Sequence, residues 1–315
     1  MRAAVVDRYG PPEVARVTDV PRPEPRAGEV LVRVRAAAVN SSDARIRGAR
    51  FPSGFGLFAR LAFGIGKPRR AVLGGALSGE VVALGGQVDG FAVGEAVCGM
   101  TGARMGAHAE YAAVRASTLA RKPDAVSHED AAAILFGGTT ALHFLRRRTS
   151  VGPGTSVLVN GASGAIGTSA VQLARHLGAT VTGVTSAANA DLVRGLGAER
   201  VIDYTRVDLA EIPDRFDVVL DTVGSLSIAS GRRLLAPGGT VALIVAGLGE
   251  LLRTRGNVVA GPAPERVEDY DFLLNLVADK ELTVVVDQTF DLLAIVDAYR
   301  RIDSGRKVGN IVVLP

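Results

Sequence analysis

Residues 157–186, VLVNGASGAIGTSAVQLARHLGATVTGVTS, are the stretch that decides the fold of this chain. They open with a short apolar run typical of a buried parallel strand, and a glycine-rich turn separates this run from an amphipathic helix. Backbone N–H groups at a helix N-terminus bind a diphosphate directly, and glycine lets the backbone approach it closely. The pattern predicts a dinucleotide cradle made of Gly161, Ala162, Ser163, Gly164, Ala165 and Ile166.

A glycine-rich turn alone is weak evidence, because such turns occur in most α/β proteins. Here the expected helix over residues 168–177 is followed by a run of β-branched residues at 180–184, which predicts a second strand. Strand, helix and strand make a complete βαβ unit. Ala162 takes the first place of the G-x-G-x-x-G fingerprint, and Gly164 and Gly167 take the other two.

The end of the second strand indicates which nicotinamide nucleotide to expect. An acidic residue there would bind the free ribose hydroxyl of NAD and would repel a phosphate. The chain has no carboxylate between Thr185 and Asp191, and Ser186 and Asn189 offer polar groups instead. We therefore expect NADPH, with a modest preference because this loop carries no cation.

Length and composition describe a globular protein of two domains. The chain has 315 residues, of which 48% are hydrophobic and 22% charged. No apolar stretch reaches the ~20 residues of a membrane helix, and no signal-peptide pattern follows Met1. These features predict a cytoplasmic protein without a membrane span.

The formal net charge of +4 raises the question of nucleic-acid binding. The only dense basic run, residues 146–148, follows an apolar helix, where cations suit the helix C-terminus, and tryptophan is absent. We therefore expect no nucleic-acid partner. The single cysteine, Cys98, has apolar neighbours, which favour a buried core thiol over a nucleophile.

The first 120 residues are β-rich, with short strand patterns separated by glycine and proline. Many short strands with frequent turns predict a barrel-like domain. The expected strands cover residues 3–7, 14–19, 29–37, 77–84, 95–99 and 110–114.

From Ser127 onward helices alternate with strands, which predicts a doubly wound Rossmann-type domain. We expect residues 1–120 and 258–315 to form one domain and residues 121–257 the cofactor domain, with the active site between them. The later elements expected are strands 217–221 and 239–245, a linker 247–264, helix 265–278, strand 282–286, helix 291–302 and strand 308–314.

Seven sequence motifs, spread over nearly the whole chain, carry a family resemblance. They are GEVLVRV (28–34), AVNSSD (38–43), SGEVV (78–82), GGTTA (137–141), the cradle, LGAERVIDY (196–204) and DVVLDTVG (217–224). In this order they resemble the medium-chain dehydrogenase/reductase superfamily, and within it the zinc-independent quinone oxidoreductase (zeta-crystallin-like) branch. The resemblance implies a GroES-like β-rich catalytic domain, a Rossmann-type cofactor domain and a homodimer formed through sheet edges of the cofactor domain.

Two related groups of oxidoreductases are disfavoured by missing residues. Zinc alcohol dehydrogenases carry a catalytic cysteine where Asn40 and Ser41 stand here, and Gly-His-Glu in place of residues 75–77. The four histidines show no ligand spacing, so we expect no metal. Short-chain dehydrogenases need a tyrosine followed four places later by lysine, and none of the five tyrosines meets this requirement.

The resemblance implies hydride transfer from NADPH to a quinone or to the β-carbon of an α,β-unsaturated carbonyl compound. Conjugation spreads the incoming charge onto a distant oxygen, so a strong Lewis acid is less necessary than for an isolated carbonyl, and positioning does most of the work. The alternative is an NADPH-binding protein with vestigial reductase activity and a regulatory or structural role.

Three residues are the expected catalytic group. Asn40 matches the family asparagine near nicotinamide and substrate and is the first choice for a residue close to them, with the capping of a turn as the alternative. Asp43 matches an acidic position, and capping of the following helix is the alternative. Arg45 stands where many quinone reductases have tyrosine, and its guanidinium faces either the cleft or solvent. Further cofactor contacts implied by the resemblance are Thr140, Tyr204, Val223, Gly224, Val245 and Asn310.

Residues 51–70, FPSGFGLFARLAFGIGKPRR, form an apolar segment directly after the Asn40 motif. Phe55, Phe58 and Leu61 fall at helical spacing, which usually means core packing. The glycines and the position of the segment favour a mobile lid over a hydrophobic substrate instead.

Overall fold

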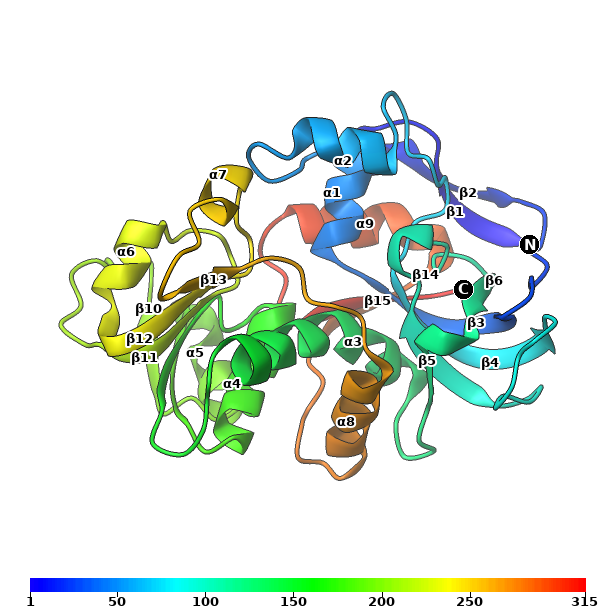
Figure 1. The fold of residues 1–315 in the computed structure, drawn as a ribbon. Helices are drawn as coiled ribbons and strands as arrows, with labels where there is room; N and C mark the ends of the chain where they lie inside the picture. Colours follow the sequence, from blue (N-terminus) through cyan, green and yellow to red (C-terminus); the bar gives the residue numbers. More distant parts are fainter.

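The glycine-rich stretch lies at the centre of a six-stranded parallel sheet in the computed structural model, which describes residues 1–315 (Figure 1). The strand order is β10-β9-β8-β11-β12-β13, which is the doubly wound order, and its two halves diverge between β8 and β11. The strands are β8 (Ser156–Asn160), β9 (Thr180–Thr185), β10 (Arg200–Asp203), β11 (Phe216–Asp221), β12 (Leu235–Leu243) and β13 (Val258–Ala260).

This sheet is covered on both faces because its strands are apolar on both faces. Val157 and Val159 point into one core together with Val171, whereas Leu158 points into a second core that includes Val241. The helices of this half are α3 (His128–Leu142), continued by a π-helical turn (His143–Arg148), α4 (Ala165–His176), α5 (Ala190–Gly195), α6 (Ile228–Arg233) and α7 (Leu248–Leu251), with a 3-10 turn at Ala187–Asn189.

The other half of the chain is built on a seven-stranded, mostly antiparallel sheet of order β14-β15-β3-β4-β5-β7, with β6 paired to β3. A separate two-stranded sheet, β1 with β2, lies beside it. The strands are β1 (Arg2–Val6), β2 (Ala15–Asp19), β3 (Glu29–Val39), β4 (Ala76–Leu84), β5 (Ala96–Met100), β6 (Tyr111–Arg115), β7 (Leu119–Arg121), β14 (Val286–Asp291) and β15 (Asn310–Leu314).

The remaining helices connect these strands or join the two halves. They are α1 (Ser41–Gly48), α2 (Gly56–Phe63), α8 (Val267–Ala278) and α9 (Ile295–Asp303), with 3-10 turns at Pro12–Val14, Gly102–Arg104, Ala116–Thr118 and Leu292–Ala294. None of the helices is both long and apolar enough to cross a lipid bilayer. The structure confirms the expected α/β class, with a β-rich domain joined to a doubly wound one.

The C-terminal third differs from the sequence prediction at two places. The expected linker 247–264 contains α7 and β13, and β13 pairs with β12, so the chain stays in the parallel sheet beyond residue 257. The strand expected at 282–286 starts only at Val286, because Thr283 is bound by a side chain instead of a neighbouring strand. Its N–H donates to Gln172 Oε1 (2.8 Å) and its carbonyl accepts from Gln172 Nε2 (2.9 Å).

The two halves meet at α3 and at two loop contacts. Ala132 and Ala133 of α3 pack against Val312 of the catalytic sheet, and α3 also packs against α4 of the cofactor domain. The N–H of Gly309 donates to the carbonyl of Ser163 (2.8 Å), which fixes the loop before β15 to the glycine-rich turn. These contacts close the two sides of a cleft.

Candidate active site

The glycine-rich turn is shaped by close approaches that only glycine allows. Gly161 has φ +80°, and a Cβ there would lie 2.4 Å from Val223 Cγ2. A Cβ on Gly167 would lie 2.1 Å from the carbonyl oxygen of Gly161. Both glycines therefore hold the turn against its neighbours, and they explain how strand β8 passes directly into α4.

Gly164 serves a different purpose, because its open side faces a cavity. A Cβ there would meet only the Gly161 oxygen at 3.4 Å, and Gly164 is the N-cap of α4 without a side-chain cap. The first-turn N–H groups of α4 are thus left for a ligand, at the positive end of the helix. This cradle, which a side chain would fill, fits the diphosphate of a dinucleotide.

A cavity of about 680 Å³ extends from this turn to the catalytic domain. It runs along the carboxyl ends of the parallel strands, where ligands bind in doubly wound sheets. Most of the predicted cofactor contacts line it. They are Asn40, Thr140, Gly161, Ser163, Gly164, Ala165, Ile166, Tyr204, Val223, Val245 and Asn310.

The other predicted cofactor contacts, Ala162, Ser186, Asn189 and Gly224, do not line the cavity. Ala162 is fully buried under the turn. Asn189 lies behind Ser163 and donates from Nδ2 to its Oγ (3.3 Å), so it supports the cradle from outside. Ala162 and Asn189 thus lie behind the wall of the cavity.

Asn40 satisfies both interpretations that the sequence left open. It is the N-cap of α1, and its Oδ1 accepts from the N–H groups of Ser42 (2.8 Å) and Asp43 (3.2 Å). Its side chain also lines the cavity, and its Nδ2 donates to no protein group. Because the cap uses the oxygen, the amide N–H₂ is the end left for a ligand.

Asp43 lies behind the wall of the cavity and does not line it. The side chain is fully buried, and its Oδ2 accepts from the backbone N–H of Asn40 (2.9 Å), which completes a capping box. Burial raises the pKa of this carboxyl, and the nearby His108 acts in the opposite direction. Asp43 therefore positions Asn40 through the backbone.

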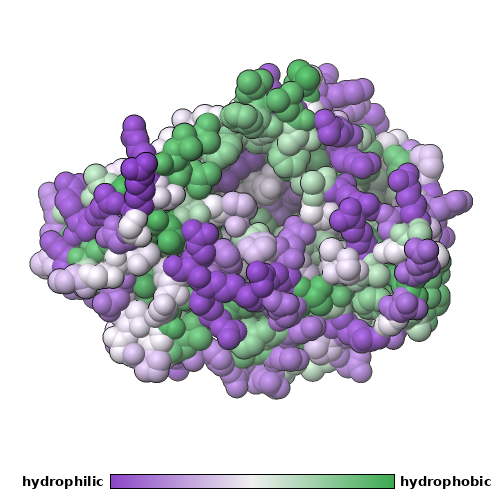
Figure 2. Space-filling model, in the orientation of Figure 1, coloured by the Kyte–Doolittle hydropathy of each residue, from purple (hydrophilic) through white to green (hydrophobic).

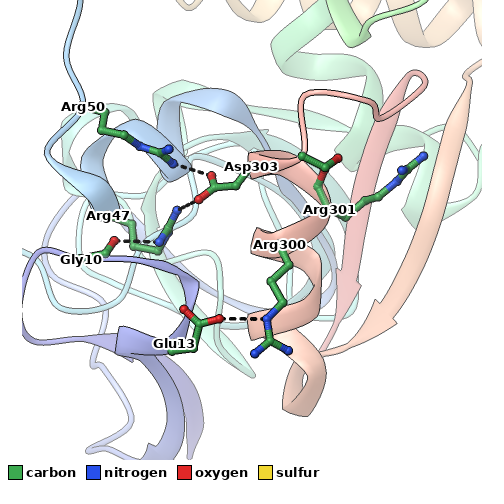
Figure 3. A network of polar contacts seen from close by, with 8 residues as sticks. Gly10, Glu13, Arg47, Arg50, Arg300, Arg301 and Asp303 are labelled. Atoms are coloured by element: carbon green, nitrogen blue, oxygen red, sulfur yellow. Dashed lines mark hydrogen bonds and ion pairs between the residues drawn. The ribbon is translucent and has the colours of Figure 1, made fainter.

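The helix that carries these residues is fixed to α9 by a buried arginine (Figure 3). Arg47 is fully buried, donates to Asp303 (2.5 Å) and to the carbonyl of Gly10 (2.8 Å), and lies over the ring of Tyr299. Arg50 reaches the same Asp303 carboxylate (2.6 Å). An anchored α1 keeps Asn40 at a fixed place in the cleft.

Arg45 lines the cavity, and its guanidinium has no hydrogen-bond or ion-pair partner in the protein. Burial lowers the pKa of its guanidinium. The side chain thus belongs to the cleft wall.

Thr140 also lines the cavity, but its hydroxyl donates to the carbonyl of Phe136 (2.7 Å), so only its oxygen lone pair and methyl group remain for a ligand.

Sequence reasoning overlooked Lys307, the one lysine that lines the cavity. Its Nζ donates to the carbonyl of Gly309 (2.5 Å), and the N–H of Gly309 donates to the carbonyl of Ser163. The ammonium therefore lies beside the cradle. Burial lowers the pKa of Lys307 to about 8, against the opposing effect of Asp287. Its only sequence signal was its place beside Asn310.

Glu265 is a second charged residue of the cavity that sequence reasoning did not select. Burial raises the pKa of its carboxyl group.

No side chain from residues 51–70 lines the cavity. The structure contains no group of three or more His, Cys, Asp or Glu side chains arranged to hold a metal ion.

Comparisons with known proteins agree with this arrangement. Residues 26–124 match the alcohol dehydrogenase GroES-like domain family, and residues 196–313 match the zinc-binding dehydrogenase family. A quinone oxidoreductase from Pseudomonas aeruginosa is 31% identical over 330 residues, which cover 98% of this chain and 97% of the relative. An NADPH-dependent alkenal/one oxidoreductase from Arabidopsis thaliana is 29% identical over 332 residues, covering 100% of this chain and 80% of the relative.

A solved structure is similar over the whole length. The quinone oxidoreductase from Coxiella burnetii superposes with a TM-score of 0.91 at 29% identity, covering 100% of this chain and 99% of the other. The overall fold is thus shared with this protein over nearly its whole length. The chain belongs to the medium-chain dehydrogenase/reductase superfamily, and its similarity within that superfamily is to quinone oxidoreductases.

Proposed function

We propose that this protein is an NADPH-dependent reductase of quinones or α,β-unsaturated carbonyl compounds that acts without zinc. The observation that carries the proposal is a single cavity that joins a dinucleotide cradle at Gly164 to the free amide of Asn40. Asn40 stands where zinc alcohol dehydrogenases have a cysteine ligand. The similar proteins from Pseudomonas and Arabidopsis carry the same two acceptor classes in their names.

NADPH would lie along the carboxyl ends of the parallel strands. Its diphosphate would meet the N–H groups at the start of α4, and Lys307 would supply a cation beside them. Ser163 is held for this purpose, because its Oγ accepts from Thr185 Oγ1 (2.8 Å) and from Asn189. The bound nucleotide supplies the hydride, and the protein supplies its position.

The catalytic domain provides the groups that face the acceptor. The Nδ2 of Asn40 can donate a hydrogen bond to the oxygen on which negative charge develops, and its capping role fixes its direction. The unpaired guanidinium of Arg45 favours the same charge electrostatically. Apolar side chains such as Met100, Phe136 and Ile302 line the cavity and limit access of water to it.

Replacement of Arg45 by alanine tests its share of this work. Turnover should fall on at least one acceptor while the Kd for NADPH stays within about twofold, since Arg45 lies on the catalytic domain away from the cradle. Unchanged turnover on every active acceptor would remove Arg45 from the mechanism. Arg148→Gln, an exposed arginine outside the cavity, is the matched control.

A homodimer formed through the free edge of the cofactor sheet is part of the proposal. The edge strand β13 pairs only with β12, so its outer backbone groups are available for a second copy. Analytical ultracentrifugation of the full chain tests this state, with a monomer at all concentrations as the contradicting result.

The function itself is tested by steady NADPH oxidation with a panel of quinones, enones and enals, before and after treatment with a strong metal chelator. We expect turnover of at least one acceptor class and no loss after chelation. Tight NADPH binding with no turnover of any acceptor would support the alternative, a binding protein with vestigial activity. Loss of turnover on chelation, restored by zinc, would contradict the zinc-independent mechanism.

A further inference from the structure

Helix α2 and the loop directly after it expose apolar side chains that a globular protein normally buries. Leu57, Phe58, Leu61 and Ile65, here called the apolar crest, have 70%, 61%, 53% and 70% of their surface exposed. No residue of α2 is buried. Figure 2 shows apolar side chains gathered at the top of the molecule, over the position of α2 in Figure 1, with a hollow below them. A contiguous exposed patch of this kind marks an interaction site.

The crest is held outward by contacts on its inner side. Phe63 stacks on Phe51 with ring centroids 6.0 Å apart, and both pack against the catalytic core. The hydroxyl of Tyr9 donates to the carbonyl of Gly64 (2.6 Å), and Arg69 donates to the carbonyl of Leu61 (2.8 Å). The segment therefore uses one apolar side for packing and presents a second one to its surroundings.

The charged residues of the segment that carries the crest are all basic. Arg60, Lys67, Arg69 and Arg70 are all exposed, and none of them forms an ion pair. The chain contains no aspartate or glutamate between Asp43 and Glu80. Apolar side chains flanked by unpaired cations are the composition of an interfacial segment that binds an anionic lipid surface.

The segment that carries the crest also touches the cofactor domain near residues that line the cavity. The N–H of Leu248 in α7 donates to the carbonyl of Ser53 (2.8 Å), so the segment before α2 touches the cofactor domain. Val245, three residues earlier, lines the cavity, as does Arg45 of α1. Leu252, just after α7 on the cofactor domain, is a further large apolar residue with 72% of its surface exposed.

We propose that the apolar crest and its four cations dock the enzyme on an anionic lipid bilayer, from which a lipophilic acceptor enters the cavity. The entry of an acceptor rests on the proposed function, whereas the docking on lipid does not. A second copy of the chain is disfavoured as the occupant, since a two-fold contact would bring the four cations of each copy together with no acidic residue of this segment to pair with them.

The test is co-sedimentation of the full chain with vesicles of phosphatidylcholine, with and without phosphatidylserine, at low and high salt. Phe58→Ser combined with Ile65→Ser removes apolar surface, and Arg60→Gln combined with Arg70→Gln removes charge. The matched controls are Leu293→Ser, an exposed leucine outside the crest, and Arg148→Gln. All changed residues are exposed, so the variants should fold.

The wild-type chain should bind the anionic vesicles and release them at high salt. Each double variant should bind roughly 25-fold more weakly or worse, since one basic residue near an anionic surface contributes roughly fivefold, a buried apolar side chain contributes at least as much, and each variant removes two of them. The control variants should bind as the wild type does. Equal binding by all variants, or no binding to anionic vesicles, would overturn the proposal.

Two further measurements distinguish a failure of this inference from a failure of the proposed function. Turnover of a water-soluble quinone without vesicles reports the reductase alone, and it should be equal in the wild type and in Phe58→Ser/Ile65→Ser. A loss there would show that the crest closes over the substrate instead, which overturns the membrane assignment. Sedimentation velocity that shows a dimer only in the wild type would assign the crest to a second copy.

Discussion

Lys307 gives the sharpest quantitative prediction, because its position is unfavourable for folding and favourable for binding an anion. Its pKa falls from 10.5 to about 8 on folding, through burial beside the cradle. A shift of this size disfavours the charged folded state by about 3 kcal/mol, at about 1.4 kcal/mol per pKa unit. Loss of the hydrogen bond to Gly309 offsets about 1 kcal/mol of this. Lys307→Met should therefore raise the free energy of unfolding by about 2 kcal/mol at pH 7.

The sign of the pH dependence follows from proton binding. Between pH of about 8 and 10.5 the unfolded chain keeps the Lys307 proton and the folded chain loses it, so wild-type stability rises with pH across this window. The advantage of Lys307→Met should be constant below about pH 8 and should shrink above it. Urea unfolding at a series of pH values measures both quantities, with the exposed Lys67→Met as the control.

The same change should weaken NADPH binding. Removing a cation beside the diphosphate should raise the Kd roughly tenfold, which corresponds to about 1.4 kcal/mol, and isothermal titration measures it. Wild-type affinity should also fall above about pH 8, while the affinity of Lys307→Met should not. A variant that is less stable at pH 7, with unchanged NADPH affinity, would refute the reasoning.

The cradle glycines, Asn40 and Cys98 give further outcomes. Gly164→Ala should keep stability within about 0.5 kcal/mol of the wild type and lose NADPH affinity. Gly167→Ala should lower the Tm, because its Cβ would lie 2.1 Å from the Gly161 oxygen. Thermal unfolding and NADPH titration measure the two effects, and equal losses of stability in both variants would contradict the prediction. Asn40→Ser keeps the helix cap and removes the amide, so kcat should fall roughly 100-fold. Asn40→Ala removes the cap as well, so it should also lose about 1 kcal/mol of stability. An unchanged kcat in Asn40→Ser would exclude the amide from the reaction. Burial raises the pKa of the Cys98 thiol to about 12, so an alkylating reagent near neutral pH should leave turnover intact, and inactivation that tracks labelling would contradict its burial.

The parts of the fold that depend on local patterns could be predicted from the sequence. The strand, turn and helix around Gly164 follow from periodicity and glycine spacing, and the observed strand β8 and helix α4 agree with that prediction. Asn40 and Arg45 were found through the family resemblance, and the cavity places both in its wall. Site residues can thus be predicted from the sequence when the strand, turn and helix that position them are contiguous in the chain.

The parts that failed depend on contacts between distant residues. The apolar run at 282–286 has the composition of a strand, but the amide of Gln172, on another element, binds the backbone of Thr283. Phe58 and Leu61 have the spacing of a packed helix, yet α2 packs through Phe63 and leaves both exposed. Lys307 acquires its place only when the loop before β15 joins the glycine-rich turn. The lid expected from residues 51–70 stays a prediction.

The central claim is that one cavity brings a nicotinamide nucleotide from the cradle at Gly164 to an acceptor beside Asn40. The most direct measurement uses NADPH carrying deuterium on C4 of the nicotinamide, an enone acceptor and mass spectrometry of the reduced product. The account predicts one deuterium at the β-carbon from one of the two labelled faces, with the other face giving none. A reduced product without deuterium from either face would contradict it.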